Sequence, residues 1–208
     1  MTDRINKLRE LFFANAHKAY RVEDLGLSIL EETEKLPFAI RKAKAFALAV
    51  EKMPLFLLEG DLLCGGKTVY KLPTYITEDE IKWGNHNFEC SGYNNIFDYP
   101  FNLGQDERGF GLNNSSIPAY YKIIPMGLPA LIADIEALKA AATDSDQIIY
   151  YDSVLIAQHA ALRIMARYEA LCREFLDSCK DEPRCRELQI MADNLAQLQV
   201  GAPQTYWQ

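Results

Sequence analysis

Hydrophobic positions recur at helical spacing near the start of the chain. One face of a first predicted helix carries Ile5, Leu8, Leu11 and Phe12. A second helix is predicted to open at Pro37, because proline is tolerated in a first turn, and to run through Val50. The segment 22–34 between them is predicted to form a shorter helix.

The same periodicity returns in the last ninety residues. It predicts helices over 118–142, over 152–179, and from near Asp181 to about residue 198, with Pro183 in the first turn of the last one. The middle helix of the three has a periodic apolar set made of Val154, Leu155, Leu162, Met165, Cys172 and Phe175. Residues 205–207 are predicted to open a further helix.

Helical periodicity is lost between these two parts of the chain. Residues 55–75 are rich in glycine and apolar residues, which predicts short extended segments around a turn. Residues 77–116 are rich in Asn, Gly, Tyr and Phe, and only the TEDE sequence at 77–80 suggests a short helix there. Long loops of this kind are often functional. We therefore expect one mainly α domain over 1–208, with helices and extended segments in 1–76, an aromatic loop in 77–116 and helices in 117–208.

Composition and charge narrow the class of protein. The chain has 208 residues and 49% hydrophobic content, enough to bury one core. Its net charge of -7 is spread along the chain without a cluster of Lys and Arg, so we expect no nucleic-acid partner. The absence of both a long apolar run and an apolar leader predicts a cytoplasmic protein without a membrane partner.

The five cysteines are an odd number and contain no Cys-x-x-Cys pair. This pattern favours reduced thiols over a disulfide framework or a structural zinc site. Their expected role is small apolar filler. His86 and Cys90, with Cys64 as a third ligand, lack a convincing fourth ligand for zinc, so we expect no metal site.

Two other motifs point to structure rather than to catalysis. The sequence GGKT at 65–68 is similar to a phosphate-binding loop, but Asp61 occupies the position where the first glycine is needed, and the following residues are β-like. Ser115 and Ser116 follow two asparagines, and these residue types commonly cap a helix. We therefore assign no catalytic residue.

Three separated segments, in this order, carry a family resemblance. The first is RKAKA at 41–45 with LFLLEGDLLCG at 55–65, and the second is IPAYYKIIPMGL at 117–128 followed by DIE at 134–136. The third joins AQHAALR at 157–163, RELQIMA at 186–192 and PQTYWQ at 203–208. Together they resemble the beginning of glycyl radical enzymes of the pyruvate formate-lyase type, especially the dehydratase, lyase and decarboxylase branches. Asp61 and Cys64 depart from a Gly-Glu-Leu-Ile-Val-Gly-like turn of that family.

The resemblance implies chemistry that these residues do not contain. Family members are several times longer, and a ten-stranded barrel holds a cysteine loop and a carboxy-terminal glycine loop. An activating enzyme with S-adenosylmethionine and an iron–sulfur cluster installs the glycyl radical, which generates a thiyl that abstracts hydrogen from substrate. No segment here resembles either loop. The chain is therefore expected to be a truncated fragment of a lyase, dehydratase or formate acetyltransferase-like enzyme of anaerobic metabolism, without a cofactor of its own and inert by itself.

The resemblance also directs attention to one part of the long loop. Several dehydratases of the family have a Gly-His pair before the second segment, and the histidine contacts substrate. Here the corresponding place has no histidine, so that role is not carried over. The substrate-proximal candidates are Asn113, Asn114, Ser115 and Ser116.

Two other functions compete with the enzyme fragment. One is a helical interaction module that partners a radical enzyme as a subunit. The other is a small-molecule binding domain built around the aromatic loop from Phe88 to Phe110. An apolar helix face left without its barrel predicts a homo-oligomer, with a dimer as the simplest form. An activating enzyme would be a partner of the parent enzyme.

Overall fold

The computed structural model describes residues 2–15, 30–33, 35–52, 55, 57–64 and 120–208. The expected aromatic loop at 77–116 and the candidates Asn113, Asn114, Ser115 and Ser116 lie outside these residues, as does the predicted short helix after residue 77. Of the helix expected over 22–34, the described part is α3, Leu30–Thr33.

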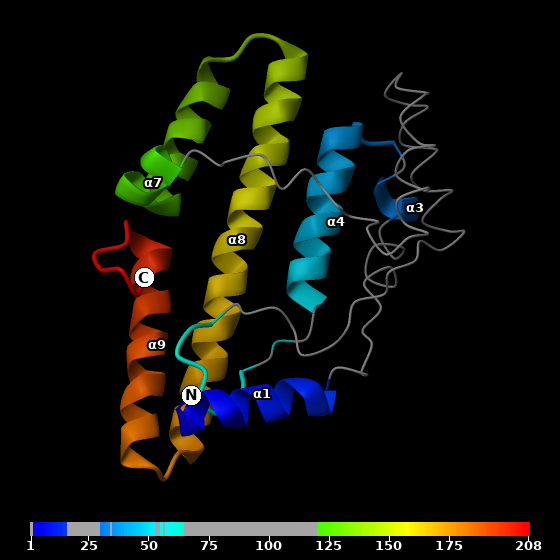
Figure 1. The fold of residues 1–208 in the computed structure, drawn as a ribbon. Coiled ribbons are helices and arrows are strands. Elements are labelled where there is room, and N and C mark those ends of the chain that lie inside the picture. The colour runs from blue at the N-terminus through cyan, green and yellow to red at the C-terminus, as the bar shows by residue number, and fades with distance from the viewer. Residues whose placement is uncertain (1, 16–29, 34, 53–54, 56, 65–119) are drawn as a thin grey trace.

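The long helix α8, Ser145–Ser178, is the centre of the fold. Figure 1 shows α7, Tyr120–Ala141, and α9, Glu182–Val200, along one side of α8, and α4, Phe38–Lys52, along the other. Helix α1, Asp3–Asn15, lies across the end of the bundle where α8 turns into α9. The described residues contain no strand, which confirms the prediction of a mainly α fold. None of the described helices is long and apolar enough to cross a membrane.

Aspartates define where α8 and α9 begin. The side chain of Asp144 accepts a hydrogen bond of 2.9 Å from the Asp146 backbone N–H, so α8 begins well before the predicted residue 152. The side chain of Asp181 accepts one of 3.1 Å from the Arg184 N–H, and Pro183 lies in the first turn of α9, as predicted.

Helix α7 is kinked, where the sequence predicted one uninterrupted helix. Gly127 has a φ of 73° between Pro125 and Pro129, and these prolines cannot donate backbone hydrogen bonds. A Cβ atom at Gly127 would lie 2.7 Å from backbone atoms of Gly201 and Ala202. The kink therefore lets α7 approach the carboxyl end of α9 more closely than any residue with a side chain would permit.

The core lies between α8 and α9. Cys172 and Ala192 have no exposed surface, Met191 is 4% exposed, and Leu57, Cys64 and Leu195 pack around them. Cys172 thus has the buried position that the periodic set of α8 predicted. Phe175, from the same set, is 38% exposed instead.

The two irregular segments at 57–64 and 205–207 both form turns. Residues 57–64 contain the predicted turn, and none of them lies in a strand: Gly60 has a φ of 98°, the Asp61 N–H donates to the Leu58 carbonyl at 3.1 Å, and the Leu58 N–H donates to the Asp61 carboxylate at 2.8 Å. Residues 205–207 make a turn closed by the Gln208 N–H and the Thr205 carbonyl, not a helix.

The prediction of reduced cysteines was wrong for one pair. Cys179 ends α8 and Cys185 lies in the first turn of α9, and the reversal of the chain between them forms a disulfide with a Cα–Cα distance of 5.7 Å. Their spacing of six residues forms no recognised motif, and only the tight connection between the two helices brings the sulfur atoms together.

Candidate functional site

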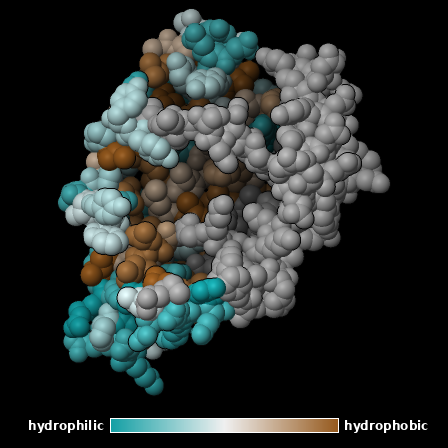
Figure 2. All heavy atoms as spheres, in the orientation of Figure 1, coloured by the Kyte–Doolittle hydropathy of each residue, from teal (hydrophilic) through white to brown (hydrophobic). Residues whose placement is uncertain are grey.

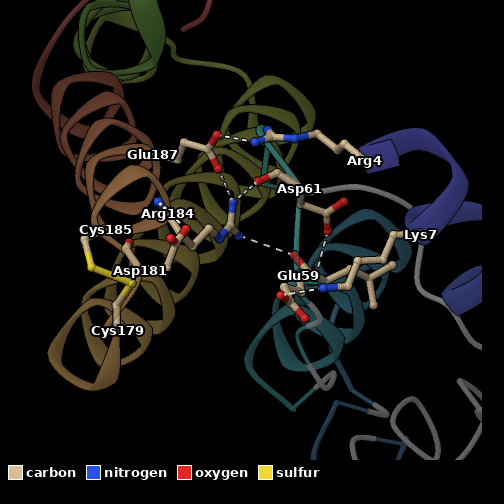
Figure 3. A network of polar contacts seen from close by, with 10 residues as sticks. Arg4, Lys7, Glu59, Asp61, Cys179, Asp181, Arg184, Cys185 and Glu187 are labelled. Atoms are coloured by element: carbon tan, nitrogen blue, oxygen red, sulfur yellow. Dashed lines mark hydrogen bonds and ion pairs between the residues drawn. A yellow bond between two sulfur atoms is a disulfide. The ribbon is translucent and has the colours of Figure 1, made fainter. Parts of the chain in front are cut away.

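The segment 57–64, called here the 57–64 turn, touches both α1 and the α8–α9 pair. One side of it meets a group of charged side chains, shown in Figure 3. Its last residue, Cys64, packs against the buried core of α8 and α9. Both positions that depart from the family-like pattern, Asp61 and Cys64, are therefore at contacts with other elements.

Arg184 fastens the 57–64 turn to α9. Its guanidinium donates hydrogen bonds to the Asp61 carbonyl at 2.6 Å and to the Leu58 carbonyl at 3.3 Å. It also donates to the Glu187 carboxylate at 3.0 Å, and only 14% of the Arg184 side chain is exposed (Figure 3). The planar fork of arginine suits such divergent acceptors, so this residue organises the turn.

Helix α1 joins this group through two ion pairs. Arg4 contacts the Glu187 carboxylate, and Lys7 Nζ lies 2.6 Å from Glu59 Oε1. Burial opposes ionisation of Glu187, but hydrogen bonds from Arg4 and Arg184 outweigh it and lower the pKa of this carboxyl. The hydrogen bond from Lys7 lowers the pKa of Glu59.

The hollow among these charged residues has a volume of about 230 Å³ and is open to solvent. Its cations and carboxylates face one another, so the charges within it largely compensate. We call this group of charged residues, Arg4, Lys7, Glu59, Arg184 and Glu187, the clasp. Its ion pairs hold α1, the 57–64 turn and α9 together, and it is not arranged as a binding site for a charged ligand.

On its other side the 57–64 turn presents a pair of thiols. The Sγ atoms of Cys64 and Cys172 are 3.3 Å apart, and both residues are free cysteines. Cys172 is fully buried, whereas Cys64 is half-buried. The hydrogen bond with Cys172, together with burial, raises the pKa of the Cys64 thiol above its ordinary value.

Beside this pair lies an open groove of about 310 Å³, lined by Cys64 and by apolar residues of α9 and the chain end, including Met191, Leu195 and Trp207. Tyr206 is 95% exposed and Trp207 57% exposed. Figure 2 shows apolar side chains in the hollowed middle of one face of the molecule, and hydrophilic ones at the end where α8 turns into α9. In the part of the chain that the structure describes, no group of three or more His, Cys, Asp or Glu residues could hold a metal ion.

Comparison with known proteins accounts for this architecture. The sequence profile described as "PFL-like: Pyruvate formate lyase-like" matches residues 108–208. The (2S)-3-sulfopropanediol dehydratase of Klebsiella oxytoca is 32% identical over 94 residues, which are 43% of this chain and 11% of that enzyme. The carboxyl-terminal part of the chain, residues 108–208, is thus similar to the pyruvate formate lyase-like family. The chain matches only a small part of the dehydratase, as the sequence predicted for a fragment of a glycyl radical enzyme.

Solved structures of larger proteins have a similar fold. A structure described as 1,2-propanediol dehydration in Roseburia inulinivorans has a TM-score of 0.72 at 17% identity and covers 100% of this chain. A glycyl radical enzyme from Archaeoglobus fulgidus has a TM-score of 0.71 at 18% identity and covers 97%. The chain spans 30% and 32% of those two proteins.

Arg41 and Arg163, from the segments that carried the family resemblance, and the nearby Arg167 make contacts between helices. Arg163 of α8 makes two hydrogen bonds of 2.6 and 2.7 Å to Glu51 of α4, and Arg167 donates to the Val50 carbonyl. Arg41 of α4 is 2% exposed and donates to the Thr33 hydroxyl at 3.4 Å. These residues therefore hold the bundle together.

Sequence reasoning missed three features of this region: Arg184, the thiol pair and the close approach at Gly127. Asp181 and Pro183 marked the start of α9, but nothing in the sequence indicated which carbonyls Arg184 would reach. Gly127 between two prolines was a signal for a kink that could have been used. The predicted candidates Asn113, Asn114, Ser115 and Ser116 stay predictions, since they lie outside the described residues.

Proposed function

We propose that this chain is the helical amino-terminal part of a glycyl radical dehydratase that acts on a small hydroxylated compound. The observation that carries the proposal is the likeness of the fold to a glycyl radical enzyme over 97% of the chain at a TM-score of 0.71. The dehydratase reaction and the hydroxylated substrate are supported by the names of the relatives, which act on sulfopropanediol and 1,2-propanediol.

In this proposal the chain supplies scaffold and substrate contacts, and the radical residues come from elsewhere in the enzyme. Hydrogen abstraction in the family needs a thiyl cysteine and a storage glycine, and no segment of the 208 residues resembles either loop. The 208 residues alone are therefore inert. Asn113, Asn114, Ser115 and Ser116 are proposed to line the substrate site in the place where some dehydratases have a histidine, within one domain that spans 1–208.

The radical itself is proposed to be installed by an activating enzyme that uses S-adenosylmethionine and an iron–sulfur cluster. A cytoplasmic location and a homodimer belong to the same proposal. The support for a dimer is the apolar surface near the chain end, where Val200 is 74% and Trp207 57% exposed, because pairing of two such surfaces removes them from water.

The test begins with the DNA that follows codon 208. If the reading frame continues into a cysteine loop and a carboxy-terminal glycine loop, the whole frame is expressed with an activating enzyme and S-adenosylmethionine. We expect a glycyl doublet in electron paramagnetic resonance, and an aldehyde product from 1,2-propanediol or a related diol. The 208-residue chain, treated identically, should give neither.

Two results would contradict the proposal. A doublet from the 208 residues alone would show that the chain holds its own radical residue. A reading frame that ends without either loop would favour the alternative function, a helical module that binds a partner through the apolar surface at residues 200–207.

A further inference from the structure

The thiols of Cys64 and Cys172 lie closer together than side-chain packing requires. Their sulfur atoms are 3.3 Å apart although the residues are separated by 108 positions in the sequence. A disulfide has a sulfur–sulfur distance of about 2.05 Å, so an approach of roughly 1.3 Å would allow a bond to form. Small side-chain rotations of two thiols that are already in contact can supply that approach.

We propose that Cys64 and Cys172 are a redox pair, which a small disulfide oxidant of the glutathione disulfide class converts into a cross-link between the 57–64 turn and α8. This inference is independent of the proposed radical chemistry. It concerns a modification site within the described residues and uses only their geometry.

The two sulfur atoms differ in how easily an oxidant can reach them from solvent, and this gives each cysteine a different role. Cys64 is half-buried and lines the open groove of about 310 Å³, so a small oxidant can reach its sulfur from solvent. Cys172 has no exposed surface and lies behind Cys64 in the core with Met191 and Ala192. Cys64 is therefore the attacking thiol, and Cys172 is the resolving thiol.

The reaction has two exchange steps. The Cys64 thiolate attacks one sulfur of the oxidant, which breaks the oxidant's disulfide, forms a mixed disulfide on Cys64 and releases one small thiol. The Cys172 thiolate then attacks Cys64 Sγ and releases the second small thiol. Two electrons pass from the protein sulfurs to the oxidant, and the two protons lost by the protein thiols are carried by the two released thiols.

The geometry of this pair differs from that of the other neighbouring cysteines in the described residues. Cys179 and Cys185 form a disulfide at the α8–α9 connection, whereas Cys64 and Cys172 are free. The contact with Cys172 and burial keep Cys64 protonated near neutral pH, because the pKa of its thiol is raised and only a thiolate attacks a disulfide. Exchange between Cys64 and the disulfide oxidant is therefore slow near neutral pH, and long incubation is needed.

The pair also depends on a position where this chain departs from its family's pattern. Cys64 stands where the family-like turn has valine, and valine would pack in the same core without offering a sulfur atom. The cross-link is thus a property expected of this chain and of relatives that have cysteine at both positions.

The test uses the 208-residue chain with Cys90→Ser, so that the fifth cysteine cannot exchange. The chain is incubated with glutathione disulfide, the free thiols are blocked with iodoacetamide, and peptides are mapped by mass spectrometry without reduction. We expect a peptide pair joined through Cys64 and Cys172, which separates on reduction, while the Cys179–Cys185 bridge persists. If both cysteines stay open to alkylation after prolonged oxidation, the proposal is wrong.

Two variants test the order of attack. In Cys172→Ser the glutathione adduct should accumulate on Cys64, because no resolving thiol remains. In Cys64→Ser the buried Cys172 should react roughly ten-fold more slowly, since it needs local opening of the core. Equal adduct formation in the two variants would overturn the assigned roles. If either substitution prevents folding, the chain that keeps both cysteines is trapped at early times of oxidation instead. A transient glutathione adduct on Cys64 then supports attack by Cys64 first, and an adduct on Cys172 contradicts it.

Discussion

Replacing Gly127 with alanine tests whether the close approach of α7 to α9 holds the bundle together. Gly127 has a φ of 73°, in the left-handed region that residues with a side chain rarely adopt. The new Cβ atom would also lie 2.7 Å from the Ala202 backbone nitrogen and Cα and from the Gly201 carbonyl carbon. These are backbone atoms, which cannot rotate away as the end of a flexible side chain can.

The expected loss of stability follows from three contributions. The left-handed backbone costs a residue with a Cβ about 1–2 kcal/mol, and forcing a methyl group into a filled space costs about 1–3 kcal/mol. Alanine restricts the unfolded chain and returns about 0.4–1 kcal/mol. The net destabilisation should be about 3 kcal/mol, a large part of the roughly 5–15 kcal/mol that stabilises a typical domain.

The measurement is urea unfolding of the 208-residue chain followed by far-ultraviolet circular dichroism. Gly201→Ala is the matched control, because it lies in the same contact but has an extended backbone with a φ of -168°. Its Cβ would meet the flexible end of Gln197 at 3.3 Å. We expect this control to lose less than about 1 kcal/mol. If Gly127→Ala loses no more free energy of unfolding than Gly201→Ala, the close approach at Gly127 does not matter for stability.

Three further predictions concern the clasp and the exposed surface. Arg184→Lys should lower the free energy of unfolding by about 2 kcal/mol, because one ammonium group cannot reach the Asp61 and Leu58 carbonyls together. The control is Arg186→Lys, at an exposed ion pair with Glu182, which should change the free energy of unfolding by less than about 0.5 kcal/mol. Equal losses in the two variants would contradict the role given to Arg184. The pKa of Glu187 is lowered in the folded chain, so its stabilisation is present above the ordinary pKa of about 4.3 and is lost as pH falls through the lower folded value. The urea midpoint should therefore fall between about pH 5 and pH 3, and less steeply in Glu187→Gln; parallel pH profiles would refute this. The exposed apolar surface near the chain end should make the chain self-associate, so light scattering across a dilution series should give the mass of a dimer. Trp207→Ser should shift the chain toward the mass of a monomer. A monomer mass for the unchanged chain at every concentration would contradict this prediction.

Local signals in the sequence were sufficient for most helices. Helical periodicity and Pro37 predicted α4, and Asp181 with Pro183 predicted the start of α9, because caps and helical faces depend on residues within one or two turns. The start of α8 was missed because Asp144 caps the helix ahead of its apolar stripe. The family was also within reach, since it depends on the order of short segments and not on their contacts.

Contacts between distant segments were decided by the tertiary structure alone. The Cys64–Cys172 contact joins residues 108 positions apart, and the Arg184 hydrogen bonds cross 123 and 126 positions. No periodicity or motif encodes such pairs, because they exist only after α8, α9 and the 57–64 turn pack in one arrangement. The same holds for Gly127, whose left-handed backbone is required by the end of α9 beside it. Sequence thus determined which segments become helices and which family they resemble, whereas packing determined which side chains and backbone atoms meet, since interactions across space depend on the whole fold.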